Sequence, residues 1–180
     1  MFDSFYELSG LGNTSSPIKP NLRTKICKYR FCTPEINYIL EVECYKFNFY
    51  VIQYYNRKYK NHPRKYQILT NEHKARPIIG TCMKVIQMFS EMDPLASFGF
   101  IGANSYDPIT GKEEKIDSTK RWKIYKYAVE NEYGPETFKH AINKLNSSYI
   151  LLRRRNDMAP AKLLDNILTV VSEFYEKAAS

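Results

Sequence analysis

Basic and aromatic side chains alternate in one short stretch of the chain. Between Arg57 and Arg76 there are seven Lys or Arg residues and one acid, Glu72, with Tyr59 and Tyr66 set among them. Cations spaced along a segment can each neutralise a phosphate, and a tyrosine ring can stack on a base for about 1 to 3 kcal/mol. This stretch indicates nucleic-acid binding, with a solvated charged loop as the alternative interpretation.

The candidate nucleic-acid surface joins this stretch to an earlier strand-like segment. Long Lys and Arg side chains reach successive phosphates of a single strand easily, and its bases are free to stack on rings. A single strand is therefore favoured over a duplex, while DNA, RNA and a nucleotide-like ligand stay open. The candidate contact residues are Lys28, Arg30, Arg57, Lys58, Tyr59, Lys60, Arg64, Lys65 and Tyr66.

A second cationic group follows the glycine-containing segment FGFIGANS. A helix that begins near Thr119 would present free backbone N–H groups and the positive end of its dipole, which suit a phosphate or carboxylate. The segment lacks the phosphate-loop ending of Lys followed by Ser or Thr, so a plain tight turn is the alternative. The candidate residues are Gly102, Thr119, Lys120, Arg121, Arg153 and Arg154.

An enzymatic hypothesis uses three residues of the second half of the chain. Arg121, Tyr125 and His140 could cleave RNA without a metal, with Arg stabilising the phosphate charge and Tyr or His moving protons. An exposed helical histidine is the alternative for His140. Glu41 and Glu43 share a strand face and are expected to form surface ion pairs. Serine-nucleophile and metal-hydrolase patterns are absent. Beyond this alternative we assign no catalytic residue, and we predict no metal and no cofactor.

Composition fits a globular protein with an affinity for anions. The chain has 180 residues, of which 43% are hydrophobic and 26% charged, and its net charge is +8. Such a charge attracts phosphate polyanions, although it also serves solubility. The four cysteines form no metal-binding pattern, and no run reaches the roughly 20 apolar residues that span a bilayer. We therefore predict a cytoplasmic protein without a membrane partner.

The first half of the chain reads as an arm followed by strands. Gly, Pro, Asn and Ser residues disfavour regular structure in residues 1–24. In the run 36–45, Tyr38, Leu40 and Val42 alternate with polar neighbours, which predicts one buried and one wet face. The strands expected here are 25–32, 36–45, 47–55 and 65–69.

The second half combines helices with short strands. Apolar residues at helical spacing predict a helix over 77–92 that packs on the sheet. Further elements are expected at 97–101 (strand), 119–132 (helix), 135–145 (helix), 147–153 (strand) and from about residue 160 (helix). Together they predict an α+β fold, with residues 25–180 forming a single domain. Its antiparallel sheet of five or six strands is expected to be covered on one face by the 77–92 helix and the closing helix.

Three segments of the chain resemble a group of small bacterial proteins of uncharacterised function. They are FGFIGANS (98–105), TKRWKIYKYAVENEYGPETFKH (119–140) and SSYILLRR (147–154). The resemblance extends over most of the domain and implies a fold with a strand-rich first half. It carries no activity and no catalytic residue to this chain. A role in phage defence or counter-defence would suit a small basic protein of such a group.

Three functional classes follow in order of preference. The first is binding of single-stranded nucleic acid or another phosphate-bearing ligand through the basic, tyrosine-rich surface. The second is the metal-independent ribonuclease. The third is a protein-interaction module or homo-oligomer, because the tyrosine-rich run FNFYVIQYY would be a sticky edge strand unless it is central or covered.

Overall fold

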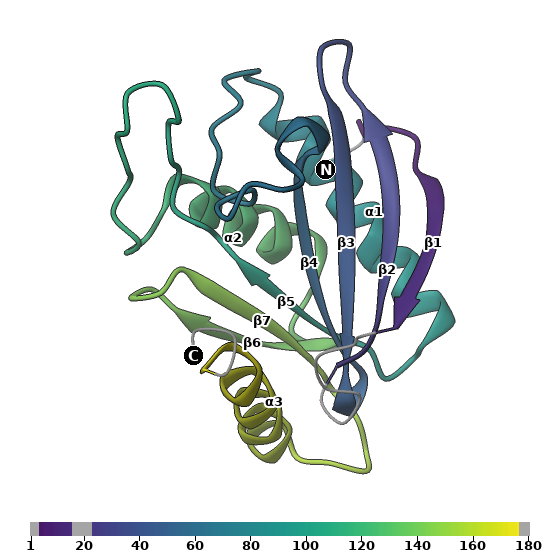
Figure 1. Ribbon diagram of the computed structural model, residues 1–180. Helices are drawn as coiled ribbons and strands as arrows, with labels where there is room; N and C mark the ends of the chain where they lie inside the picture. Colours follow the sequence, from purple (N-terminus) through teal and green to yellow (C-terminus); the bar gives the residue numbers. More distant parts are fainter. Residues whose placement is uncertain (1–3, 16–22, 177–180) are drawn as a thin grey trace.

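A single seven-stranded sheet forms the centre of the protein (Figure 1). The computed structural model describes residues 4–15 and 23–176. The spatial order is β1-β2-β3-β4-β5-β7-β6, and neighbours are antiparallel except β4 and β5, which are parallel. The strands are β1 (Ser9–Ser15), β2 (Arg23–Cys32), β3 (Asn37–Tyr45), β4 (Phe49–Asn56), β5 (Ser97–Ile101), β6 (Phe138–Asn143) and β7 (Ser148–Arg153).

Helices cover both faces of this sheet. α1 (Ala75–Met92) and α2 (Lys120–Glu132) lie behind it in Figure 1, and α3 (Pro160–Glu176) lies in front of its lower part. The α+β prediction is confirmed, with seven strands in place of five or six. Within the described residues, no helix is both long and apolar enough to cross a lipid bilayer.

The closing helix packs on the face opposite to the one we predicted. Leu163 and Ile167 of α3 share a small core with Phe49 and Val51 of β4. The larger core lies on the other face, where α1 and α2 meet the sheet. Helical periodicity shows that a helix has an apolar side, but not which face of a sheet will receive it.

β3 is buried on both faces although its sequence alternates. Leu40 and Val42 lie in the larger core. Glu41 and Glu43 project from the opposite face, yet only 3% and 5% of their surfaces are exposed. The face that we predicted to be wet is therefore covered, in part by the loop that follows β4.

The tyrosine-rich strand β4 is central, because it lies between β3 and β5. A short 3-10 helix, η1 (Lys46–Asn48), joins it to β3. Phe47 and Asn48 in this turn have φ of 63° and 56°, a left-handed conformation that reverses the chain within three residues. Pairing on both sides removes the exposed edge that suggested self-association.

One segment predicted to be irregular forms a strand, and one segment predicted to be a strand does not. Part of the expected N-terminal arm, residues 9–15, forms edge strand β1 beside β2. Residues 16–22 of the arm lie outside the described residues. Residues 65–69 form no strand, and only Ile68 makes an isolated bridge with Tyr106. Whether each segment forms a strand depends on backbone pairing with a distant part of the chain, which the local sequence does not predict.

The segment predicted as a helix over 135–145 contains strand β6 instead. It pairs with β7 in register from Phe138 opposite Arg153 to Asn143 opposite Ser148. Short apolar runs fit both the helical and the extended period. The free edge of β7 offered backbone partners that a helix would have left unused.

Candidate nucleic-acid interface

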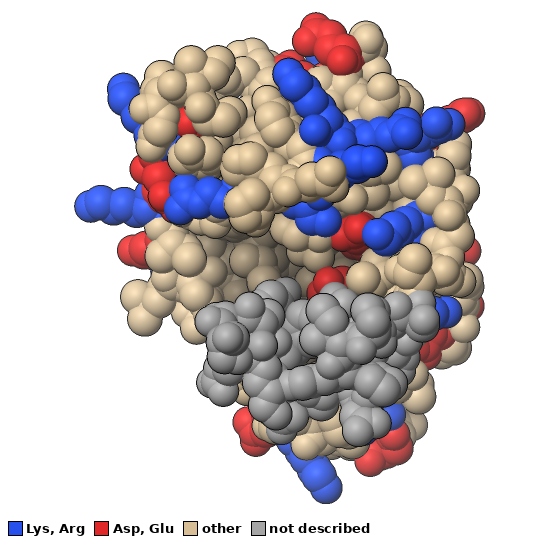
Figure 2. Space-filling view, in the orientation of Figure 1, with Lys and Arg blue, Asp and Glu red and all other residues tan. Residues whose placement is uncertain are grey.

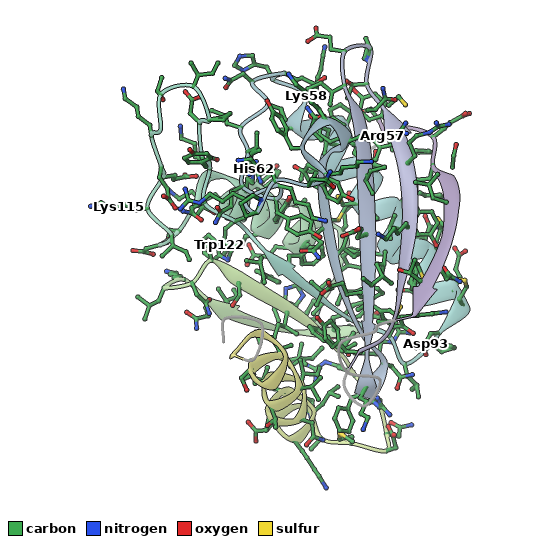
Figure 3. The ribbon with its side chains drawn as sticks, viewed as in Figure 1. Arg57, Lys58, His62, Asp93, Lys115 and Trp122 are labelled. Carbon is green, nitrogen blue, oxygen red and sulfur yellow. The ribbon has the colours of Figure 1, made fainter. Side chains whose placement is uncertain are left out.

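The basic stretch forms a loop, residues 57–69, between β4 and α1. It begins with a short 3-10 helix, η2 (Arg57–Tyr59), which the Asn56 side chain caps by accepting a hydrogen bond from the Lys58 N–H at 2.9 Å. Farther along, the His62 N–H donates to the Tyr59 carbonyl at 2.8 Å. Figure 3 shows Arg57, Lys58 and His62 on this loop, near the upper end of the sheet. These local bonds give the loop a defined shape.

Four cations near this end of the sheet make no ion pair with any described residue. They are Arg30 of β2 and Arg57, Lys58 and Lys60 of the loop, and we call them, together with Tyr59, the cationic surface. Lys and Arg side chains gather at the upper right of the face shown in Figure 2.

A groove of about 630 Å³ opens beside this surface. Arg57, Lys58 and Tyr59 line it, and Asn56 and Glu35 contribute further polar atoms. Tyr59 is half-buried, and the Lys58 ammonium lies 5.6 Å from the centre of its ring. The groove thus presents a guanidinium group, an ammonium group and an aromatic ring side by side, next to one acid.

The other cations predicted for this surface are bound to an internal acid. Glu41 accepts hydrogen bonds from Tyr66 and, at 3.3 Å, from Tyr55. The ammonium groups of Lys28 and Lys65 lie 3.0 and 3.6 Å from its carboxylate oxygens. The expectation that Glu41 forms a surface ion pair is wrong, because loop and strand close over it and leave its side chain 4% exposed.

The charge state of Glu41 follows from this environment. Burial raises its pKa, but the hydrogen bonds from Tyr66 and Lys28 and the charges of Lys65 and Lys28 outweigh burial, so that the pKa lies below its ordinary value. Burial and the neighbouring carboxylate raise the pKa of Tyr66 far above its ordinary value. At neutral pH the group is therefore an ionised carboxylate that binds two cations and neutral tyrosines.

Arg64 is also occupied. Its guanidinium binds Glu113 at 3.0 Å and stacks over the Tyr106 ring at 4.6 Å. Of the nine residues predicted for nucleic-acid contact, Lys28, Arg64, Lys65 and Tyr66 thus hold the fold together. The remaining five form the cationic surface.

The second predicted group surrounds the start of α2. Thr119 donates to the Gly102 carbonyl at 2.6 Å and accepts from the Trp122 N–H at 3.1 Å. The Lys120 N–H donates to Glu114 at 2.8 Å, and the Arg121 guanidinium donates to the carbonyls of two loop residues, 66 and 68. These groups do meet, but the backbone N–H groups of Thr119 and Lys120 and the Arg121 guanidinium already bind the chain itself.

Arg153 and Arg154 lie far from the cationic surface. The Arg153 N–H donates to Ser97 at 3.0 Å, and Ser97 pairs with Phe49 at the start of β4. Seven steps along β4 at about 3.3 Å each, about 23 Å in all, separate Phe49 from Asn56 at the end of the strand, where the loop begins. Figure 3 likewise shows Asp93, which accepts from Asn48 at 2.9 Å, at the opposite end of the sheet from Arg57.

The residues of the ribonuclease hypothesis do not share one cavity. Arg121 and Tyr125 line a pocket under the loop, which His140 does not line. The two nitrogens of the His140 ring contact the Tyr149 hydroxyl at 2.5 Å and the Tyr133 carbonyl at 3.0 Å. His140 belongs to strand β6 rather than to an exposed helix, and it is half-buried.

That pocket, of about 520 Å³, is a feature that sequence reasoning missed. Glu43 of β3 and Gln53 of β4 reach it from the sheet, and Tyr66 and Gln67 from the loop. Because Glu41 lies opposite Gln53 in the register of β3 and β4, three polar residues occupy one small area of the face. Polar residues at alternate positions of two neighbouring strands were the available signal.

Comparisons of the chain with family models, with curated proteins and with solved structures gave no match. The resemblance to a bacterial group therefore stays a prediction. Among the described residues, no group of three or more His, Cys, Asp or Glu side chains is arranged to hold a metal ion. Function has to be inferred from the geometry of the side chains.

Proposed function

We propose that this protein binds single-stranded nucleic acid at the cationic surface. The observation that supports the proposal is the group of four cations, Arg30, Arg57, Lys58 and Lys60, that lack an acidic partner among the described residues. Cations already paired with carboxylates gain little from a phosphate, whereas unpaired ones exchange only water and mobile ions for it.

A strand fits this surface better than a duplex does. The groove beside Arg57 and Lys58 holds the half-buried Tyr59 ring, and a ring can stack only on a base that is free of its partner. Glu35 on the groove wall repels phosphates and sets one limit of the path. The phosphates would therefore follow the four cations while a base lies against Tyr59.

The test compares two double variants that remove the same charge. Arg57→Ala/Lys58→Ala alters the cationic surface, and Lys139→Ala/Lys162→Ala removes two exposed lysines from β6 and α3. At 50 mM salt we expect the first to weaken binding of a labelled 12-nucleotide strand about 10- to 100-fold. The second should change affinity less than about threefold, because long-range charge effects are screened.

Two results would contradict the proposal. One is the absence of salt-sensitive binding by the wild-type protein to both DNA and RNA strands of mixed sequence. The other is equal weakening by the two double variants, which would mean that net charge alone attracts the strand.

We also assign the protein to the cytoplasm, on the state of its cysteines. Cys27, Cys32, Cys44 and Cys82 are free thiols, and the Cys27 and Cys44 sulfurs lie 3.9 Å apart without a bond. Disulfides persist in oxidising compartments and are rare in the cytosol. Thiol titration of protein purified without reductant, giving four free thiols under denaturing conditions, would agree with this assignment.

A further inference from the structure

A residue that lines the pocket under loop 57–69 has an unpartnered acceptor. Gln67 lines this pocket, and its side-chain oxygen Oε1 is buried without a hydrogen-bond partner. A buried acceptor without a donor is unfavourable, and most such groups in folded proteins are satisfied. A donor on a ligand in this pocket, which we call the Gln67 pocket, would satisfy the oxygen once the side chain turns toward it.

The orientation of the Gln67 amide is fixed by a chain of hydrogen bonds. The Asn104 Nδ2 donates to the Glu113 carboxylate at 2.5 Å and to the Glu114 carbonyl at 3.2 Å, both of which can only accept. Asn104 must then present its oxygen to Gln67, whose Nε2 donates to it at 3.0 Å. The Glu113 carboxylate also lies 3.0 Å from the Arg64 guanidinium. Rotating the Gln67 amide by 180° would break this chain, so Oε1 is the free atom.

The pocket's remaining walls favour a flat, uncharged heterocycle. Tyr54, Tyr66 and Tyr125 belong to the lining, and Ile101, which is 45% exposed, stands at its rim. Arg64 and Arg121 line it too, but their guanidinium groups bind Glu113 and the carbonyls of residues 66 and 68. The Glu43 carboxylate belongs to the same lining and repels phosphate. A volume of about 520 Å³ lies in the range of pockets that hold small ligands.

We propose that the Gln67 pocket holds one nucleobase with an exocyclic amino group. The amino group of cytosine, adenine or guanine donates to Gln67 Oε1, which turns toward the base by a small pivot about its bond to Asn104. Uracil and thymine instead offer a single ring N–H flanked by two carbonyls, and the Glu43 carboxylate in the lining is an acceptor that repels carbonyl oxygens. The pocket therefore favours amino-bearing bases over uracil and thymine.

This inference rests on the proposed function, since the base belongs to the strand that the cationic surface holds. Loop 57–69 contributes to both places: Arg57 and Lys58 border the outer groove, and Tyr66 and Gln67 line the pocket. Phosphates stay outside with the cations, while one base turns inward beneath the loop. Charge and base recognition are thus divided between the two sides of one loop.

The experiment uses three strands and three variants. Wild-type protein should bind oligo(dC) about tenfold more tightly than oligo(dU), and a strand of abasic units no better than oligo(dU). Gln67→Leu removes the acceptor, and Ile101→Trp fills the pocket from its exposed rim. Both should lower the oligo(dC) affinity to that of oligo(dU) without changing the salt dependence. Arg57→Ala, in contrast, should weaken all three strands by the same factor.

The outcomes separate the two proposals. If all three strands bind equally and neither pocket variant alters affinity, the pocket inference is overturned while strand binding stands. If no strand binds, the proposed function fails, and the pocket is then decided by NMR titration with free nucleosides. If cytidine shifts the Gln67 side-chain amide signals and uridine does not, the pocket inference is supported. If neither nucleoside shifts them, the inference is overturned.

Discussion

The salt dependence of strand binding can be derived from the ion pairs of the structure. The sequence offers seven cations at the candidate surface, but Lys28 and Lys65 bind Glu41 and Arg64 binds Glu113. Four cations remain for phosphates. Each contact with a single strand adds about −0.7 to the slope of log K against log salt concentration, so the expected slope is about −2.8.

Four and seven phosphate contacts predict different losses of affinity as the salt concentration rises. With four contacts, raising the salt from 50 to 200 mM lowers affinity about 50-fold, whereas seven contacts would lower it about 900-fold. Fluorescence anisotropy with a labelled strand at four or five KCl concentrations measures the slope directly. A slope steeper than about −4.5 would show that the internal pairs open for phosphates, and a slope near zero would remove the electrostatic basis of binding altogether.

Three further predictions concern the framework. Because the pKa of Glu41 is lowered in the folded state, its stabilising contribution is present above the ordinary glutamate pKa of about 4.3 and is lost as the pH falls through the lower folded value. The thermal stability of Glu41→Gln should therefore fall below wild type at pH 7 and approach it near pH 3. Gly102→Ala should cost about 1 to 3 kcal/mol, because a Cβ there would lie 2.4 Å from an atom of α2; Gly10→Ala, with open space around it, is the control, and equal urea midpoints would contradict this packing. Ile167→Ala should cost about 2 to 5 kcal/mol in urea unfolding, since Ile167 lies on the face of α3 that packs on the sheet and is fully buried. Leu168→Ala should cost far less, since Leu168 is 48% exposed; similar losses would mean that α3 does not pack as described.

Elements with strong local signals could be predicted from the sequence. The alternation in 36–45 and the apolar stripe of 77–92 both gave the correct element, because one face of each meets the core. β6 could not be predicted, since its run is short and its pairing with β7 decided its conformation. The side of the sheet that receives α3 was equally invisible, because both faces offered apolar residues.

At the candidate surface, too, contacts between residues close in the chain could be predicted, and contacts between distant segments could not. Arg57, Lys58 and Tyr59 follow one another in the chain and lie together as expected. Lys28 and Lys65 were expected to join them, but the acid that binds both belongs to a third segment. Whether a cation is free depends on strand register and on the path of the loop, which local sequence does not reveal.

Glu41 therefore influences function without touching the proposed strand. By binding Lys28 and Lys65 and accepting from Tyr66, it ties the loop to the sheet and fixes the roof of the Gln67 pocket. The same contacts withdraw two cations from the outer surface. If the carboxylate were absent, the loop would lose its anchor and the surface would gain free charge. Stronger but less selective strand binding is the consequence to expect, because charge attracts every strand while the pocket distinguishes bases.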